Sequence, residues 1–433
     1  MQADYHTGHV IDYLQNRTGL LLGCDGRRFR FIHRSLREFL AARFLAHSDS
    51  LSDLENLRSA CQYDPGWWRE VLALMTRISD RQRDPSHTDT LLHHLLRYNP
   101  GEIPALQDLP DSDWLLAEVV AQAEAERDPT GDTANRDRRA LRHRCIGWLV
   151  HLIEDNALAD SPIQREQATL TLDRFGDPRR GVGAHPDHPD LPDIDWVEIP
   201  PGKVVLEKGG GEFIIEQPFL IARYPVTNTQ FQLFIDDPEG HGNRRWWRGF
   251  ELAYAEPKPS FRPEGNHPKT EVSWFEAMAF CRWLTEHLRQ RELIEPGWTV
   301  RLPTEWEWQQ AATGGLPDNI YPWGTEFDET RANTSAGGPG SSTAVGLYRS
   351  DQSLQGVFDL AGNVWEWCLN PYDDPAKLQL DNLSEFRVLR GGAWGNPASL
   401  ARAACRGGYP PVSRDSVIGL RVLCAPLSLF TDH

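Results

Sequence analysis

Cysteine, histidine and carboxylate side chains are the groups of this sequence that could bind a metal ion or act as nucleophiles. The seven cysteines are odd in number and scattered, without the Cys-x-x-Cys spacing of zinc sites: Cys24, Cys61, Cys145, Cys281, Cys368, Cys405 and Cys424. This usage favours free thiols in a reducing cytoplasm. His93 and His94 are adjacent but lack an obvious set of further ligands, so we interpret them as solvated histidines. The sequence contains no Gly-x-x-x-x-Gly-Lys-Ser/Thr phosphate loop, so this chain alone is not expected to hydrolyse ATP.

Length and charge narrow the class of protein and its partners. The 433 residues suggest two or three domains, and 40% hydrophobic residues are enough for packed cores. The formal net charge of −17 makes nucleic acids and anionic membranes poor candidates as partners. No apolar run approaches the length of a membrane span, so we expect a cytoplasmic protein that contacts no membrane.

The elements that would position any site differ between the two parts of the chain. Up to residue 174, apolar residues recur at helical spacing, as at Phe39, Leu40 and Phe44, so residues 1–174 are predicted to form an all-α domain. Residues 175–194 are rich in Gly, Pro, His and Asp and are predicted to be a linker. From 195 to 427, short β-prone runs alternate with Gly and Pro turns. The predicted fold class is α+β, with a helical domain followed by a loop-rich domain.

Two helices and a hairpin are predicted inside the loop-rich domain. An apolar stripe begins at Trp274 and ends at Leu288, with Ser273 as its N-cap and Glu276 completing a capping box. A second helix is predicted over residues 304–312. The Gly-Gly-Gly run at 209–211, between two β-prone segments, predicts a hairpin turn.

A series of motifs in this domain resembles the formylglycine-generating-enzyme, or sulfatase-modifying-factor, family. They include Arg301-Leu-Pro-Thr-Glu-Trp-Glu307, Asp359-Leu-Ala-Gly-Asn-Val-Trp-Glu-Trp367 and Arg390-Gly-Gly-Ala-Trp394, in the family's order, together with residues 219–228, 267–268, 272–277, 321–324 and 418–421. The resemblance covers about half of the chain and implies a variant of the C-type lectin fold. From the residues themselves, the many tryptophans favour a role in maintaining the fold.

The resemblance does not extend to the oxidase chemistry of the family. Members that oxidise a substrate cysteine bind copper through two cysteines after the Gly-Gly-Ser/Ala-Trp motif, because thiolates suit that soft ion. Here Asn396 and Ala401 stand at those positions, and Cys405 is the one cysteine of the segment. No copper is expected, and the chain is predicted not to be an enzyme.

A calcium ion is the one metal that the resemblance still implies. It would place Asp359 and Glu366 as carboxylate ligands, with the carbonyl oxygens of Gly362 and Val364 beside them. Such hard oxygen ligands suit calcium. The alternative is that the two carboxylates only satisfy local backbone donors.

The last segment also resembles the variable proteins of diversity-generating retroelements, in which adenines of asparagine (AAC-type) codons are replaced at random. In that pattern the constant positions would be 390–394, 401–404, Arg406, Pro411, Arg414 and 418–421. The ligand-binding variable positions would lie within 395–417: Gly395, Asn396, Pro397, Ser399, Leu400, Cys405, Gly407, Gly408, Tyr409, Pro410, Val412, Ser413, Asp415, Ser416 and Val417.

Codon arithmetic gives this interpretation a test. Changing the first two bases of AAC never yields a codon for Lys, Glu, Gln, Met or Trp, and none of these occurs between Gly395 and Arg421. The alternative is an ordinary enzyme-derived loop of small residues. Tyr409 is the one aromatic residue among the variable candidates, so we expect it to be the strongest single contact.

The helical part carries a further resemblance. Residues 31–42 and 67–72 resemble the region that follows the nucleotide-binding module of NACHT-type signalling ATPases, where His33 would have a structural or nucleotide-sensing role. We therefore predict a sensor module that binds an unknown protein or other ligand and acts with a signalling ATPase or effector domain. The alternatives are a divergent formylglycine-generating oxidase acting on cysteine-containing peptides, and a carbohydrate-binding domain suggested by the lectin fold alone.

Overall fold

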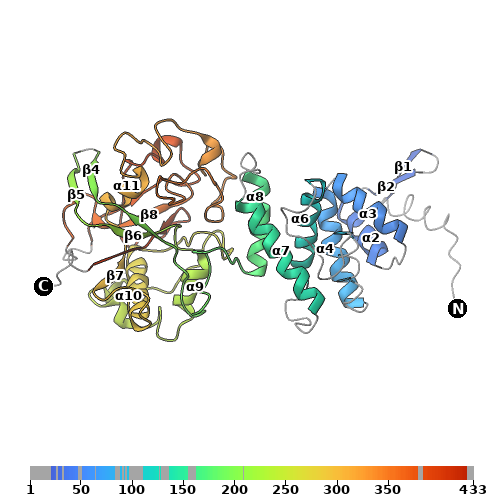
Figure 1. Cartoon of the computed structure of the whole chain (residues 1–433), viewed down its shortest axis with the longest axis horizontal. Helices are drawn as coiled ribbons and strands as arrows, with labels where there is room; N and C mark the ends of the chain where they lie inside the picture. The colour runs from blue at the N-terminus through green and yellow to red at the C-terminus, as the bar shows by residue number, and fades with distance from the viewer. Residues whose placement is uncertain are drawn as a thin grey trace. The chain divides into compact units, whose positions relative to one another are not determined.

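The chain forms two compact units, Met1–His151 and Leu152–His433. The computed structural model (Figure 1) describes residues 21–25, 28–31, 34–46, 51–63, 65–82, 88–89, 92, 95–96, 111–125, 127, 136–154, 162–207, 209–378 and 384–426. His33, His93 and His94 lie outside the described residues, so the predictions made for them stay predictions.

The first unit is built around helix α4. Its elements are β1 (Leu21–Asp25), β2 (Arg28–Phe31), α2 (Arg34–Ala46), α3 (Leu51–Tyr63), α4 (Pro65–Gln82), α6 (Asp111–Ala125) and most of α7 (Arg136–Glu154). Helix α4 contacts α2, α3 and α6, and buries Val71, Leu72 and Met75. The β1–β2 hairpin departs from the all-α prediction for this part of the chain. The Asp25-Gly26 dipeptide between two β-prone runs is the sequence feature that indicates a hairpin.

The boundary between the units falls earlier than the sequence predicted. Helix α8 (Pro162–Phe175) belongs to the second unit, although residues 1–174 were expected to form one helical domain. The predicted linker 175–194 is also part of this unit, since the Thr227 hydroxyl donates to Val182 O, and the side chain of Arg179 donates to Val345 O. These contacts to distant residues hold the segment in place, and composition alone does not show them.

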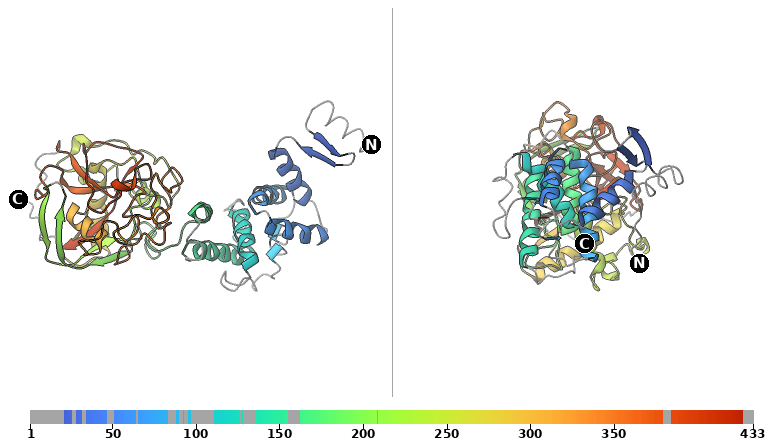
Figure 2. Two further views of the ribbon diagram at one scale, coloured as in Figure 1. Left: turned by 90° about the horizontal axis from the view of Figure 1, so that it is seen from above. Right: turned by 90° about the vertical axis from the view of Figure 1, so that its right-hand side faces the viewer.

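Three small sheets organise the second unit (Figure 2). Their strands are β3 (Trp196–Ile199), β4 (Gly202–Leu206), β5 (Gly211–Ile215), β6 (Phe219–Ala222), β7 (Trp298–Arg301), β8 (Trp365–Pro371), β9 (Arg387–Arg390), β10 (Gly407–Tyr409), β11 (Ile418–Leu420) and β12 (Leu423–Pro426). The strand orders are β3-β6-β12-β7, β10-β9-β8-β11 and the hairpin β4-β5. Strand β11 runs parallel to β8, while the other pairs are antiparallel. The hairpin predicted around residues 209–211 is therefore confirmed.

Helices and short 3-10 turns connect these sheets. They are α9 (Asn228–Asp236), η4 (Arg244–Trp247), η5 (Glu251–Ala253), α10 (Trp274–Gln290), α11 (Glu305–Thr313), η6 (Glu329–Arg331) and η7 (Ala398–Leu400). The capping box predicted for α10 is confirmed, because the Ser273 side chain accepts from the Glu276 backbone and Glu276 accepts from the Ser273 backbone. Helix α11 is also confirmed, with Thr304 as its N-cap.

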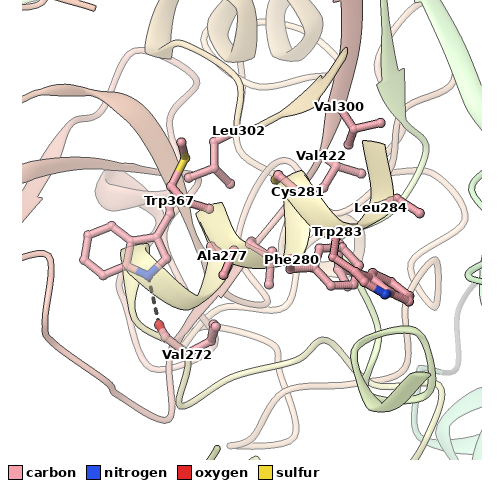
Figure 3. Close-up of a cluster of buried hydrophobic side chains, with 14 of the residues drawn as sticks. Val272, Ala277, Phe280, Cys281, Trp283, Leu284, Val300, Leu302, Trp367 and Val422 are labelled. Carbon is pink, nitrogen blue, oxygen red and sulfur yellow. Dashed lines mark hydrogen bonds between the residues drawn. The ribbon is translucent and has the colours of Figure 1, made fainter. Parts of the chain in front are cut away.

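The main core of the second unit surrounds α10 (Figure 3). Trp274, Trp283 and Trp367 are fully buried there. The indole of Trp367 donates to Val272 O at 2.9 Å, so its one polar atom is satisfied. Large aromatic side chains thus supply apolar area in a domain with little regular structure.

Six of the seven cysteines are buried and free of disulfides: Cys61, Cys145, Cys281, Cys368, Cys405 and Cys424. Among the described helices, none combines the length and apolar character that crossing a membrane requires.

Candidate ligand-binding surface

Both ends of segment 390–421 are held in one sheet. Strand β9 leads into the segment, β10 pairs with β9 as an edge strand, and β11 returns beside β8 with Ile418 opposite Trp365. Apart from β10 and the short turn η7, the chain between Arg390 and Ile418 is loop. The sheet therefore fixes where these loops start and end.

Burial separates the two classes of position that the sequence distinguished. Twelve of the sixteen predicted constant positions are buried: Arg390, Gly391, Gly392, Ala393, Ala401, Ala403, Arg406, Pro411, Ile418, Gly419, Leu420 and Arg421. Fourteen of the fifteen predicted variable positions are at least partly exposed, and Cys405 is the exception at 6%. Their role in binding stays a prediction, but this placement gives it a physical basis, because exposed positions accept different side chains without disturbing a core.

Buried arginines hold the segment from beneath. Arg390 and Arg406 both reach Glu305, the first residue of α11, at 3.3 Å and 2.6 Å. Arg390 also donates to Ala403 O at 2.6 Å, and Arg406 to Tyr372 O at 2.8 Å. One buried carboxylate and two carbonyls thus fix the path of the loop between β9 and β10.

A second buried pair fixes the end of the segment. The Arg421 guanidinium donates to both oxygens of Glu366 on β8, at 2.6 Å and 2.9 Å. It also donates to the carbonyl oxygens of Ala222, Arg223 and Phe358. A fully buried guanidinium with this many acceptors is well satisfied, whereas losing one partner would leave an uncompensated charge.

Two further arginines tie the outer parts of the segment to the unit. Arg414 Nε lies 2.8 Å from an oxygen of Glu276, which completes the capping box of α10, and Arg414 Nη1 donates to Glu256 O. Arg402 forms a half-exposed pair with Glu207 after β4, at 2.5 Å. Pairs as exposed as this one contribute little stability, so the buried ones carry most of the anchoring.

A glycine turn sets the direction of the chain after β9. Gly391 and Gly392 have φ values of 97° and 74°, a region that favours glycine. A Cβ on Gly392 would lie 2.8 Å from Leu400 O, whereas a Cβ on Gly395 would meet no atom within 4 Å. The turn therefore requires glycine at 392 but leaves 395 open to any side chain.

Four predicted variable positions do not present a free side chain. Cys405 is buried, and the Asn396 side chain accepts hydrogen bonds from Ala393 N and from the Trp365 indole, at 3.0 Å and 2.8 Å. Asp415 accepts from the backbone of Val417. A Cβ on Gly408 would come within 2.8 Å of the Tyr372 ring. At these positions a new side chain would change contacts inside the unit.

The most exposed of the remaining positions lie on two stretches. Gly395, Pro397 and Ser399 are exposed in the turn before and within η7. Tyr409 at the end of β10 is 45% exposed and Val412 is 64% exposed. The exposed part of the Tyr409 side chain can therefore contact a ligand while β10 holds its backbone.

The residues that the resemblance gave to calcium are placed around the turn before β8. Asp359 accepts from Gly346 N at 2.7 Å and from the Asn363 side chain at 3.3 Å. Both oxygens of Glu366 are bound to Arg421, and one also accepts from the Trp308 indole at 2.6 Å. A calcium ion that used Glu366 would have to compete with a guanidinium, so the carboxylates present do not fit the expected ligand set. In the described part of the chain, no three His, Cys, Asp or Glu side chains are grouped as a metal site.

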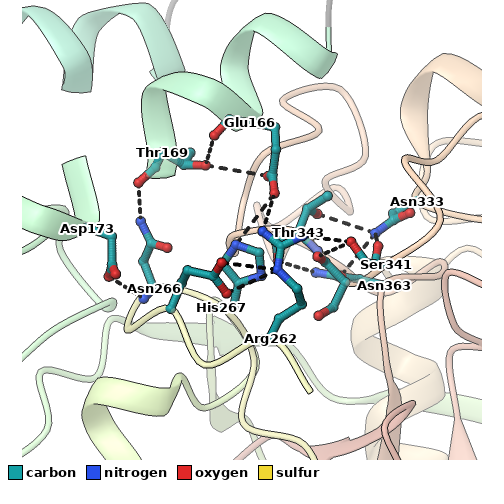
Figure 4. A network of polar contacts seen from close by, with 12 residues as sticks. Glu166, Thr169, Asp173, Arg262, Asn266, His267, Asn333, Ser341, Thr343 and Asn363 are labelled. Atoms are coloured by element: carbon teal, nitrogen blue, oxygen red, sulfur yellow. Dashed lines mark hydrogen bonds and ion pairs between the residues drawn. The ribbon is translucent and has the colours of Figure 1, made fainter. Parts of the chain in front are cut away.

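Sequence reasoning missed a polar network that attaches α8 to the unit (Figure 4). Glu166 Oε1 accepts from Arg262 at 3.1 Å and lies 3.6 Å from the His267 ring. Asn266 donates to Asp173 and to Thr169 O, both at 3.0 Å. Burial raises the pKa of Glu166 to about 7 and lowers that of His267 to about 3. The His267-Pro268 motif was visible in the sequence, but Glu166 lies 96 residues before Arg262 and nothing local indicates the pairing.

Known proteins are similar to this chain over about half of its length. A family model described as the sulfatase-modifying factor enzyme 1-like domain matches residues 186–426. The inactive C-alpha-formylglycine-generating enzyme 2 of Bos taurus is 28% identical in a 292-residue alignment that covers 52% of this chain and 90% of that protein. Hercynine oxygenase of Mycolicibacterium thermoresistibile is 31% identical in a 248-residue alignment that covers 48% of this chain and 51% of that protein. Among solved structures, Treponema denticola variable protein 1 has 22% identity and a TM-score of 0.41, covering 54% of this chain and 95% of that chain.

These relatives include a protein named as inactive and one named as an oxygenase, so their names alone do not assign an activity. The family model spans more than half of the chain and includes every sheet of the second unit. Through residues 186–426, the chain belongs to the family of proteins with a sulfatase-modifying factor enzyme 1-like domain.

Proposed function

We propose that the second unit is a non-catalytic recognition module whose exposed surface within 395–417 is diversified to bind a protein or other ligand. The observation that carries the proposal is the separation of positions in segment 390–421. Most residues predicted to be constant are buried, and buried Arg–Glu pairs hold them in place, while nearly all those predicted to vary are at least partly exposed. An ordinary loop has no reason to match a codon pattern in this way.

The scaffold suits a surface whose side chains change. Because the buried pairs of Arg390, Arg406 and Arg421 fix the backbone, a ligand does not have to order the loop when it binds. Tyr409 and Val412 supply exposed apolar area near the middle of the segment. In this copy the binding energy would come from Tyr409 and from the shape of the surrounding Gly, Ser and Pro residues.

The wider setting of the module is part of the same proposal. The resemblance of residues 31–42 and 67–72 to NACHT-type ATPases supports coupling to a signalling ATPase or effector domain. The cysteine usage supports a cytoplasmic location. In this scheme, ligand capture by the second unit changes the state of the ATPase, and neither nucleic acid nor a membrane is a partner. Calcium has no role in this scheme.

The DNA beside the coding sequence tests the diversification. We expect a near-copy of the DNA for residues 390–421, with adenines at the codons proposed to vary, and a reverse transcriptase gene close by. Mismatches between the two copies should fall at the codons of exposed positions such as Gly395, Tyr409 and Val412. A coding sequence without such a copy would end the retroelement proposal and leave the fold unchanged.

A copper assay separates recognition from the oxidase alternative. The chain has Asn396 and Ala401 where that chemistry needs thiols, and the Asn396 side chain is bound to Ala393 N and Trp365. We expect no aldehyde product from cysteine-containing peptides after incubation with Cu(I) and oxygen, and identical behaviour of Cys405→Ser. Turnover that Cys405→Ser abolishes would reverse the assignment.

A further inference from the structure

A small pocket with an unusual wall lies between α9 and a proline-rich loop. It measures about 240 Å³. Four residues on one face of α9 form one wall: Asn228, Phe231, Gln232 and Ile235. The other wall consists of Pro257, Lys258, Pro259, Ser260, Pro263 and Lys269. The lining thus contains two of the five lysines of a chain with net charge −17, and no carboxylate.

Lys269 is the buried charge of this pocket. It is 4% exposed, and its Nζ donates to Lys258 O at 2.5 Å and lies 5.5 Å from the centroid of the Phe231 ring. An ammonium group has three N–H donors, and in the described part of the chain Lys258 O is the one hydrogen-bond acceptor that Nζ reaches. A buried ammonium without a carboxylate in contact is costly, so such groups normally have a partner.

The carboxylates around Lys269 are already paired with other cations. Glu276 of α10 lies 2.8 Å from Arg414, and Glu271 lies 3.7 Å from Lys258 Nζ. Burial lowers the pKa of Lys269 to about 8; the charges of Glu276 and Glu271 oppose this shift, while Arg414 adds to it. The ammonium therefore gains from any anion that enters the pocket and contacts it.

We propose that this pocket binds a small organic carboxylate, with its charged group on Lys269 and its apolar body between Phe231 and the prolines. The volume equals that of roughly eight water molecules and falls below the roughly 300 Å³ at which drug-sized ligands begin to fit. A short aliphatic or aromatic acid matches both the size and the apolar walls. The site does not depend on the diversified surface, so each proposal can fail without the other.

Benzoate is a suitable probe, and NMR of the full chain carrying ¹³C-labelled lysine is the measurement. Because the chain has five lysines, the signal of Lys269 can be assigned by elimination, with each of the other four lysines changed to Met in turn. It should titrate near pH 8, and saturating benzoate should raise its pKa, since an anion stabilises the charged form. The signal of Lys203, an exposed lysine on β4, should not respond to benzoate.

Variants make the test specific. Lys269→Met should weaken benzoate binding about tenfold or more, while the matched control Lys203→Met should bind like the parent chain. Inorganic phosphate should bind more weakly than benzoate, because it has no apolar body to bury. Any of three results would overturn the proposal: an unchanged Lys269 signal in the parent chain, an equal response at Lys203, or tighter binding of phosphate than of benzoate. None of these measurements depends on whether Lys269→Met folds.

Discussion

Single atoms decide which positions of the C-terminal segment accept a new side chain. Gly392 and Gly395 lie three residues apart in one turn, yet only Gly392 has a positive φ and a carbonyl oxygen where its Cβ would stand. The same reasoning excludes Gly408 as a position that accepts a new side chain freely, because its Cβ would meet the Tyr372 ring. Exposure alone is therefore an incomplete guide to a variable position.

The two glycines form a matched pair for mutation. Gly392→Ala should lower the free energy of unfolding by about 1–3 kcal/mol, because the left-handed conformation and the contact with Leu400 O both oppose a Cβ. Gly395→Ala should change it by less than about 0.5 kcal/mol. Urea unfolding of both variants measures the difference, and equal costs would show that the turn is not fixed as described.

Among the elements, α8 is attached to the second unit mainly through polar groups. Glu166, Thr169 and Asp173 face Arg262, Asn266 and His267, while Leu172 and Ala168 bury apolar area. Buried charges of this kind are sensitive to protonation. The attachment of α8 should therefore depend on pH in a range set by Glu166.

The pKa of Glu166 is raised by burial to about 7, so the folded state favours its neutral form. The preference of the folded state for protonated Glu166 adds to the free energy of unfolding at pH values below the ordinary glutamate pKa. This contribution is lost as the pH rises through about 7. Glu166→Gln cannot ionise and serves as the reference. Relative to it, the free energy of unfolding of the parent chain should fall by up to about 3 kcal/mol between pH 5 and pH 8. His267 is common to both proteins and largely cancels.

Urea unfolding at the two pH values measures this difference, and hydrogen exchange of α8 shows where it arises. Glu212→Gln, which removes an exposed carboxylate on β5, is the control and should shift the free energy of unfolding by less than about 1 kcal/mol at either pH. A pH-independent difference between the parent chain and Glu166→Gln would contradict the role given to Glu166.

At the scale of the whole molecule, the division after His151 makes α8 part of the second unit, which contains the family domain of residues 186–426, rather than of the helical unit. A chain of residues 152–433 should then unfold cooperatively. Starting at 176 instead removes Leu172, Ala168 and the α8 partners of Arg262 and Asn266, so the free energy of unfolding should fall by at least about 2 kcal/mol. Thermal and urea unfolding of the two chains decide the matter, and equal stability would restore the boundary predicted near residue 174.

The sequence by itself determined the features that depend on near neighbours along the chain. The capping boxes of α10 and α11 need residues only three apart, Ser273 with Glu276 and Thr304 with Glu307, and both formed as such spacing predicts. The ordered motifs also identified the family. The exclusion of five residue types between Gly395 and Arg421 marked the segment proposed to vary.

Only the tertiary structure decided which side chains of that segment face outward and what holds them. Glu305 and Arg406 are 101 residues apart, and Glu366 and Arg421 are 55 apart, so no local pattern announces either pair. The second pair joins Glu366, which the resemblance proposed as a calcium ligand, to Arg421 between β11 and β12. Long-range partners depend on how sheets and helices stack, and a single sequence carries no direct record of that stacking.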